Sequence, residues 1–378
     1  MIEHDCHPAA QTANGLRTRR RWGSDVISLR FGAGASVDSL SLSGAASVGE
    51  YLFLAPDEGA SLVRLRRSGN TAYDEAASYP VADFADTPGD AGDELDLEGM
   101  DVGGGYLWLA GSHSAVRTRV RDRTRPGEIP GQLAEIRQPK ARTLLARIPL
   151  SDGSTGPSPA VTPAKFVGER TAARLSGDNG RGLLDVLRRD EHLGPFAGLP
   201  GKDNGLDIEG LAAVGSRILL GLRGPVLRGW AVILELEPRQ DRDNPQRLRL
   251  ERIGDGDSPA RYRKHFVDLA GLGIRDLARN GDDLLLLAGP TMLLDGPSRI
   301  LQIPGGAAKP LAAALHRSEL VQLGPDLPVG QGADHPEAIT VIPSTGSSPC
   351  ALVAYDSPSD ERRQPGGVVV ADVVRLTP

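Results

Sequence analysis

The chain has 378 residues, of which 39% are hydrophobic and 24% charged, and its formal net charge is -6. It contains 47 glycines and 29 prolines but only 4% aromatic residues. The apolar share excludes general disorder, no stretch approaches the roughly 18 apolar residues of a membrane helix, and abundant glycine and proline disfavour a long helical array. Acidity and scarce aromatic residues argue against nucleic-acid binding. We therefore expect a soluble, turn-rich protein of short strands that binds neither membrane nor nucleic acid.

The N-terminal segment, residues 1–34, is polar and carries four arginines between residues 17 and 21. It lacks the apolar stretch of a signal peptide, and the chain has only two cysteines, so we expect a cytoplasmic location. The segment is also a candidate for closing the fold of a single domain that spans residues 35–378.

A repeated pattern begins after this segment. Each of five units has an acidic or polar opening, a Gly or Asp turn, an apolar second strand that ends in a polar residue, and an apolar third strand. The second strands are predicted at residues 51–55, 106–110, 217–222, 283–288 and 350–355. The third strands are predicted at residues 61–65, 144–150, 230–236, 299–303 and 368–374.

The openings share one register, which is occupied by Ser43, Glu98, Glu209, Arg275 and Glu337. Propeller blades usually repeat every ~40–50 residues, and most of these intervals are slightly longer. The interval from Glu98 to Glu209 is nearly two units, which leaves room for an insertion or a divergent blade. The pattern predicts an all-β fold, a β-propeller with five or six blades. A pair of β-sandwiches is the alternative, although it would not explain why the openings repeat.

Two insertions interrupt the repeats, at about residues 112–143 and 151–204. Between residues 117 and 142 the first has eight basic residues against three acidic ones. The second contains a short helical pattern at residues 183–187. Long insertions in a compact fold often serve as binding loops, so they are candidates for contacting a protein partner. We otherwise expect a monomer.

The repeated openings also suggest a polar site on the propeller axis. Residues two apart in a strand share a face, so the acidic or polar pairs at the openings would project toward one ring. Concentrated negative charge requires a cation or an arginine for compensation. The predicted ligands of a divalent cation, with Ca²⁺ as the candidate, are Asp96, Glu98, Asp207, Glu209 and Glu337.

Polar residues at the ends of the second strands, Asp57, His113, Arg223 and Asp356, would add a mixed rim. The predicted binding residues for a small anionic molecule are Lys202, Arg223, Arg275 and Asp356. His113 or His335 would transfer protons. In the structural alternative, the acids cap turns or pair with arginine between blades, and the histidines form ordinary turn hydrogen bonds.

Two segments carry a family resemblance. Residues 202–211 read Lys-Asp-Asn-Gly-Leu-Asp-Ile-Glu-Gly-Leu, and residues 221–225 read Gly-Leu-Arg-Gly-Pro. These segments, together with residues 111–114 and 355–358, resemble the bacterial domain-of-unknown-function family 3616, from about residue 37 to the C-terminus. The resemblance implies a propeller-like fold and no established activity. More loosely, the Asp-x-Glu-Gly-Leu opening resembles phytase-like and esterase-like propellers, which bind calcium and cleave phosphate esters.

The leading hypothesis is a propeller whose axial site binds a small anionic ligand with a divalent cation and hydrolyses a phosphate ester by metal-assisted activation of water. One alternative is a non-catalytic scaffold whose insertions contact a protein. Another is a metal-free lyase or isomerase that uses histidine and glutamate as acid and base.

Overall fold

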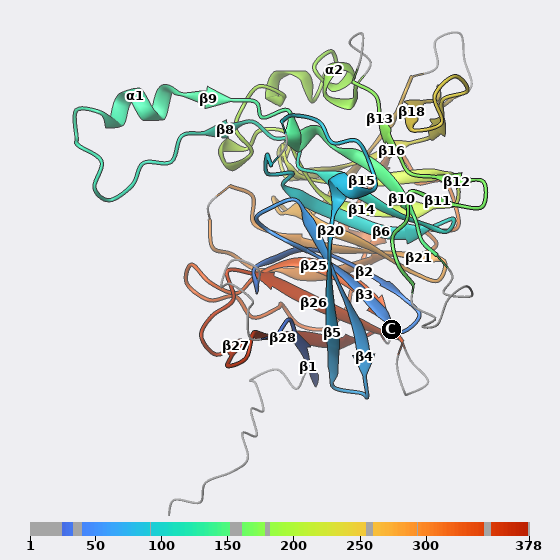
Figure 1. Cartoon of the computed structure of the whole chain (residues 1–378). Helices are drawn as coiled ribbons and strands as arrows, with labels where there is room; N and C mark the ends of the chain where they lie inside the picture. The colour runs from blue at the N-terminus through green and yellow to red at the C-terminus, as the bar shows by residue number, and fades with distance from the viewer. Residues whose placement is uncertain are drawn as a thin grey trace, which may run out of the picture.

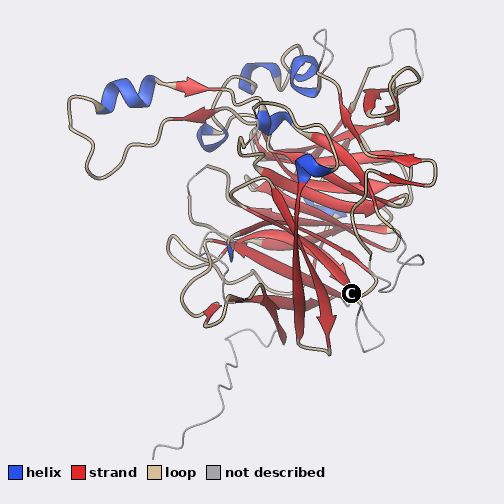
Figure 2. Cartoon of the chain, viewed as in Figure 1, coloured by secondary structure: helices blue, strands red, loops and turns tan. Residues whose placement is uncertain are grey.

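The structure, a computed structural model, describes residues 25–32, 40–90, 92–151, 161–177, 182–254, 260–292, 294–343 and 349–376. Strands dominate it, and the few helices are short (Figures 1 and 2). The all-β prediction is confirmed: the described part of the chain forms a β-propeller of five blades.

Each blade is an antiparallel sheet whose first strand lies innermost. Blade 1 consists of β2 (Leu42–Val48), β3 (Tyr51–Pro56), β4 (Ser61–Ser68) and β5 (Ala72–Pro80). Blade 2 consists of β6 (Leu97–Gly103), β7 (Tyr106–Gly111), β10 (Leu145–Pro149) and β13 (Ala173–Leu175), extended outward by β18 (Arg247–Leu250) and β17 (Pro238–Gln240).

The remaining blades follow the same order. Blade 3 consists of β14 (Asp207–Val214), β15 (Arg217–Gly224), β16 (Trp230–Leu236) and β19 (Arg263–Asp268), with β23 (Ala314–Leu315) at its edge. Blade 4 consists of β20 (Gly273–Asn280), β21 (Asp283–Gly289), β22 (Arg299–Ile303) and β24 (Val321–Gln322). Blade 5 consists of β25 (His335–Ile342), β26 (Cys350–Asp356), β28 (Val368–Arg375) and β1 (Asp25–Arg30), with β27 (Arg363–Gln364) beside β28.

The last blade contains strands from both ends of the chain. β1 pairs antiparallel with β28, so that Leu29 lies opposite Val369, and it also pairs in parallel with β5 of blade 1. The N-terminal strand therefore lies at the seam between blades 5 and 1. Residues 1–24 of the N-terminal segment lie outside the described residues.

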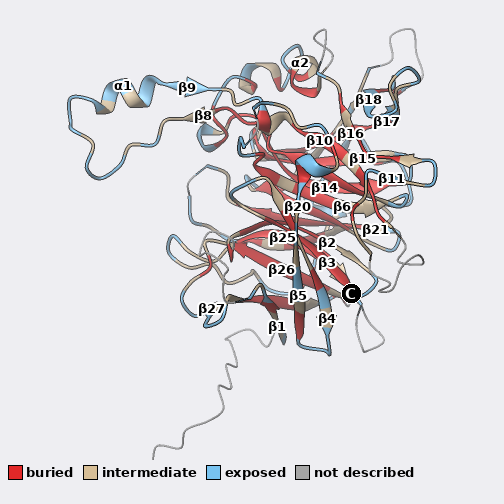
Figure 3. Ribbon diagram, in the orientation of Figure 1, coloured by how far each residue is buried: buried red, intermediate tan, exposed pale blue. Residues whose placement is uncertain are grey.

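The core is divided among the contacts between blades. Five apolar clusters lie between adjacent blades, one for each pair around the ring. Inner strands are covered on both faces, and all eight residues of β14 are buried (Figure 3). Such strands have long apolar runs because neither face meets water. The polar residues within them are therefore notable, since each is surrounded by packed sheet.

The long interval between Glu98 and Glu209 contains insertions rather than a sixth blade. The first insertion projects from the body as β8 (Val116–Arg117), α1 (Ile129–Ala134) and β9 (Ile136–Arg137) (Figure 1). The second contains the hairpin β11 (Phe166–Val167) and β12 (Arg170–Thr171), and the helix α2 (Leu183–Leu187). It also contains β13, so part of the segment expected as an insertion is the fourth strand of blade 2.

The two insertions meet above one end of the propeller axis. Ala115 and Pro200 form an isolated bridge, and the amide of Gly201 donates to the carbonyl of Ala115 at 3.1 Å. Arg117 forms an ion pair with Asp203 at 2.7 Å. We call this end of the propeller, toward which the second strands run, the mouth face. Among the described residues, no helix combines the length and apolar character required to cross a bilayer.

Candidate functional site at the mouth of the propeller

A β-bulge occurs at the same place in the inner strand of every blade. The ladder to the second strand shifts across one residue each time, and these residues are Ser43, Glu98, Glu209, Arg275 and Glu337. A bulge leaves one residue out of the ladder and re-aims its side chain. Because the inner strands contact one another in a closed ring, the bulged residues surround the axis at the register that the sequence indicates.

Two arginines neutralise part of this ring. Nε of Arg275 lies 2.9 Å from Oε2 of Glu209, and the same guanidinium pairs with Glu337. Arg223, near the end of β15, contacts Glu209 at 2.8 Å and Asp207 at 2.5 Å. None of these side chains is more than 9% exposed. The arginines expected to hold an anion are thus already engaged by carboxylates of the protein itself.

Glu98 lies in the ring without such a partner. Among the described residues, no cationic side chain forms an ion pair with it, although Asp96, two residues earlier, pairs with Arg142 at 2.9 Å. Burial raises the pKa of Glu98 well above its ordinary value, and the negative charges of Asp96 and Glu209 raise it further. The ring therefore carries more negative charge than its arginines compensate.

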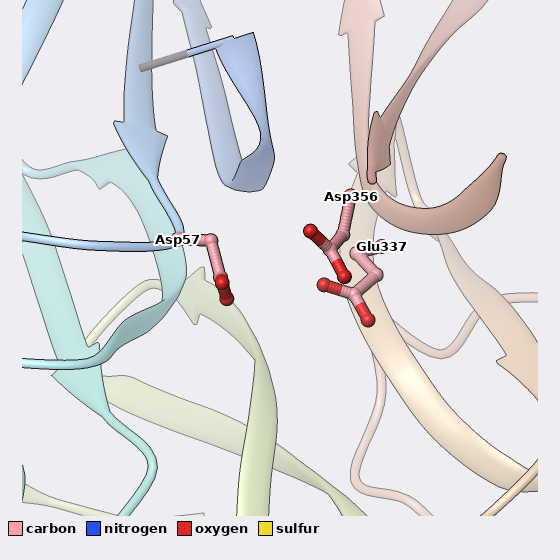
Figure 4. Close-up of side chains that lie close together, drawn as sticks. All are labelled: Asp57, Glu337 and Asp356. Atoms are coloured by element: carbon pink, nitrogen blue, oxygen red, sulfur yellow. The ribbon is translucent and has the colours of Figure 1, made fainter. Parts of the chain in front are cut away.

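A second set of carboxylates lies where the second strands end. Asp57 directly follows β3 of blade 1, and Asp356 is the last residue of β26 in blade 5. Their carboxylates approach that of Glu337, so that one oxygen from each residue lies within 4.8 Å of the other two. In Figure 4, Asp57 faces Glu337 and Asp356 across the seam between the two blades. Three carboxylate oxygens at this spacing match the ligands that Ca²⁺ and Mg²⁺ prefer.

This triad differs from the ligand set expected from the sequence. Of the five expected carboxylates, Glu337 belongs to it and also pairs with Arg275. Arginines pair with Asp96, Asp207 and Glu209, and Glu98 lies outside the triad. The physical reason is that the buried carboxylates are desolvated, and arginines within reach compensate them before any external cation does.

The triad carboxyl groups have opposite pKa shifts. Burial raises the pKa of Asp57 to about 7, with further increases from the charges of Asp356 and Asp96. Burial also acts to raise the pKa of Asp356, but hydrogen bonding from His335 and Ser357 outweighs it and lowers the pKa. Two carboxyl groups with separated pKa values can hold one proton between them near neutral pH.

Two further expected residues lie beside the triad. His335 begins β25, with Nδ1 3.9 Å from Asp356 and Nε2 3.6 Å from Asp295 at the outer edge of the mouth. Lys202 is exposed and lowers the pKa of Asp57 through its charge, which places the ammonium group within electrostatic range of that carboxyl. It forms no ion pair with the described residues, so it is available to an anionic ligand.

His113 has a different environment. Its side chain is only 1% exposed, and Nδ1 is bonded to the carbonyl of Gly111 at 2.9 Å. Burial lowers its pKa to about 4, with the bond to Gly111 opposing the shift, so the ring is neutral at pH 7. Within the described residues, no carboxylate forms an ion pair with it. This environment corresponds to the structural alternative, a histidine that completes a turn.

A family model described as "Protein of unknown function (DUF3616)" matches residues 41–372. The chain belongs to this family. The resemblance seen in the sequence is thereby confirmed. No curated protein matches the chain.

Several solved structures resemble this DUF3616 chain at low similarity. The PQQ-bound aldose sugar dehydrogenase of Streptomyces coelicolor has 13% identity and a TM-score of 0.35, and the match covers 94% of this chain and 99% of that one. A putative 6-phosphogluconolactonase from Bacteroides fragilis has 13% identity and a TM-score of 0.32, with 88% and 69% covered. PhoX of Pseudomonas fluorescens, in complex with vanadate, has 11% identity and a TM-score of 0.29, with 96% and 77% covered. These similarities are too low to bear on the chemistry of the family.

The Gly-Leu-Arg-Gly-Pro segment of this DUF3616 chain has a structural role at the site. It forms the end of β15, where Arg223 reaches both Asp207 and Glu209. A Cβ atom at Gly224 would overlap the carbonyl oxygen of Gly205, so only glycine permits the close approach of these two segments.

Two residues of this site, Asp57 and Arg142, are absent from the ligand sets predicted from the sequence. Asp57 was recognisable as the counterpart of Asp356 in another blade, because both follow an apolar second strand. Arg142 contacts Asp96 at 2.9 Å and Glu94 at 3.2 Å from the far end of the first insertion. No sequence pattern links Arg142 to these acids, since the insertion folds back before blade 2 continues.

Proposed function

We propose that the mouth of this propeller binds a divalent cation, Ca²⁺ foremost, together with a small anionic ligand. The observation that carries the proposal is the convergence of Asp57, Glu337 and Asp356 within 4.8 Å. The raised pKa values of Asp57 and Glu98 accord with it, since burial is their main cause and the charges of neighbouring carboxylates raise them further without full compensation. A bound cation would supply that compensation.

The anionic ligand would complete the coordination of the cation. Lys202 supports this part of the proposal, because it is exposed near Asp57 and has no ion-pair partner among the described residues. Arg223 and Arg275 would remain paired with Asp207 and Glu209 and thereby reduce the negative potential that opposes an anion. A phosphate monoester fits a site of this kind, since its oxygens are hard ligands and acceptors for lysine.

We further propose hydrolysis of a phosphate ester as the reaction. A divalent cation supplies an acidified water molecule and stabilises charge on phosphate oxygens. Within the chain, His335 would transfer the proton, since it contacts Asp356 and is 35% exposed toward the mouth. His113 is buried and held by Gly111, so we assign it no catalytic role.

Calorimetric titration of the chelator-treated full chain with CaCl₂, MgCl₂ and MnCl₂ tests the cation site. We expect one site per chain, with affinity reduced at least tenfold in Asp57→Asn and in Asp356→Asn. Glu58→Gln is the matched control, because Glu58 is exposed, adjacent to Asp57 and outside the triad, and it should leave the affinity unchanged. Absence of binding by all three cations would overturn the proposal.

A panel of phosphate esters, assayed with and without the preferred cation, tests the reaction separately. We expect cation-dependent turnover that falls in His335→Gln while cation affinity is retained. Cation binding without turnover of any ester would leave the binding site standing and reject the hydrolase.

A further inference from the structure

Charge is strongly segregated along the first third of the chain. Residues 68–116 contain ten acidic residues and neither lysine nor arginine. Residues 117–137, which follow directly, contain six arginines against three acidic residues. Opposite charges therefore dominate two consecutive segments of the chain.

The basic block forms the projecting arm, defined here as residues 116–137. Its helix α1 has six residues and no buried side chain, and β8 and β9 have two residues each. A helix this short is unstable in water without tertiary packing, and so is an isolated two-stranded hairpin. The contacts within the arm therefore stabilise its secondary structure poorly. Docking on another molecule would supply the missing contacts.

The base of the arm is nevertheless fixed to the body. The guanidinium of Arg117 is bonded to the carbonyl of Leu133 within the arm and to Asp203 on the mouth face. Farther out, the side chains of Arg121 and Arg123 are exposed and form no ion pair within the described part of the chain. These arginines are therefore accessible to a partner.

Apolar side chains are exposed mainly on the same side of the molecule. Of the seven large hydrophobic residues that are exposed in the described ranges, two lie on the arm, Leu133 at 47% and Ile136 at 42%. Three others lie in loops of the mouth face, Leu199 at 39%, Met292 at 37% and Leu294 at 61%. Apolar groups gathered on one face and edged by charge are typical of a protein interface.

A complementary surface lies on this face. The acidic strip, defined here as residues 81–90 and 92–96, starts at the end of β5 and leads to the inner strand of blade 2. The amide of Leu95 donates to the carbonyl of Gly59 at 3.2 Å, which places the strip at the mouth end of blade 1. Asp83 and Asp90 are exposed and form no ion pair with the described residues.

We propose that the edge of the mouth face formed by the arm and the acidic strip, rather than its centre at the triad, is the interface of a two-fold symmetric dimer, in which the arm of each copy docks on the acidic strip of the other. In such an interface, a contact between arm and strip occurs twice, because each surface is present on both copies. The arm and the strip belong to the same face, so one two-fold axis can bring both pairs together. Leu133 and Ile136 of the arm would add apolar contact area beside these charges.

Sedimentation velocity of the full chain across a range of concentrations tests the dimer. We expect a dimer that dissociates as salt is raised, because exposed charges are screened. Arg121→Glu/Arg123→Glu should be monomeric, and so should Asp83→Lys/Asp90→Lys. Combining all four substitutions in one chain should restore the dimer, since the charges are exchanged between the two surfaces.

Arg242→Glu/Arg252→Glu is the matched control, with the same charge change on exposed residues beside the outer strands of blade 2. Its oligomeric state should equal that of the unmodified chain. Circular dichroism should show that all variants remain folded. A wild-type chain that stays monomeric at high micromolar concentration overturns the proposal. A different acidic protein would then be the candidate partner of the arm. A dimer that the arm and strip variants leave intact also overturns it.

Discussion

Arg275 and Glu209 occupy the same bulged position in adjacent blades, and their side chains form an ion pair across the channel at 2.9 Å. Blade 4 thus has a basic residue at the bulged position where blades 2, 3 and 5 have a glutamate. The same guanidinium also pairs with Glu337 of the next blade, so a single substitution in the repeat compensates two buried carboxylates. The negative charge that remains is concentrated at Glu98 and near the seam between blades 5 and 1.

Arg275→Met should destabilise the protein strongly. Removing one partner of a buried ion pair typically costs about 3–5 kcal/mol, because the remaining charge is left without compensation. Urea denaturation measures the loss. Arg299→Met in the same blade is the matched control, since its pair with Asp326 is partly exposed and should contribute about 0–1 kcal/mol. Equal losses in the two variants would contradict a compensating role for Arg275.

Calcium should partly rescue the same variant. If a divalent cation binds at the mouth, it can replace the positive charge that Arg275→Met removes near Glu337. We therefore expect CaCl₂ to raise the Tm of Arg275→Met by more than it raises the Tm of the unmodified chain. An equal shift in both would mean that the cation binds elsewhere.

The stability of the cation-free protein should fall as pH rises from about 4 to 7. Burial raises the pKa of Asp57 from 3.8 to about 7 and that of Glu209 from 4.5 to about 7. In this window Asp57 and Glu209 bind more protons in the folded state than in the unfolded state, and together they outweigh the opposite contribution of His113, so the free energy of unfolding decreases with pH. Thermal denaturation at each pH measures the slope, which should be shallower in Asp57→Asn. Calcium affinity should rise over the same window, since the cation competes with the proton on Asp57.

Gly201→Ala should disturb the mouth, because a Cβ atom there would overlap the carboxylate of Asp207, which is itself paired with Arg223. Overpacking of this kind typically costs about 1–3 kcal/mol. Gly198→Ala, three residues earlier, is the matched control, since no heavy atom lies within 4 Å of its Cβ position. Differential scanning calorimetry compares the two. A neutral Gly201→Ala would show that the loop over Asp207 can move without loss of stability.

The blades could be predicted from sequence because their inner three strands are long, apolar and repeated. The predicted third strand at residues 299–303 coincides with β22 (Arg299–Ile303), and the other second and third strands agree within a few residues. The fourth strands of blades 2 and 4 could not be predicted. β13 has three residues and β24 has two, which is too short for any periodicity to stand out.

The shared register of the repeats predicted which residues surround the axis, but not which of them would pair. Arg223 lies 16 residues from Asp207 along the chain, and that spacing alone does not show whether its partner is a protein carboxylate or a ligand. Asp57 and Asp356 come from opposite ends of the chain, and only closure of the ring brings them together. Contacts of this kind depend on the number and twist of the blades, which no local pattern encodes.

The position of β1 beside β28 has a consequence for the order of events on the ribosome. β1 is synthesised early and can pair with β5, but it cannot gain its antiparallel partner until β28 has emerged. Asp57 likewise cannot approach Asp356 until blade 5 has formed. Synthesis proceeds from the N-terminus, and closing so long a loop carries an entropic cost. A nascent chain that stops before Asp356 at the end of β26 would therefore lack a complete acidic triad, so cation binding would report that blade 5 has formed beside blade 1.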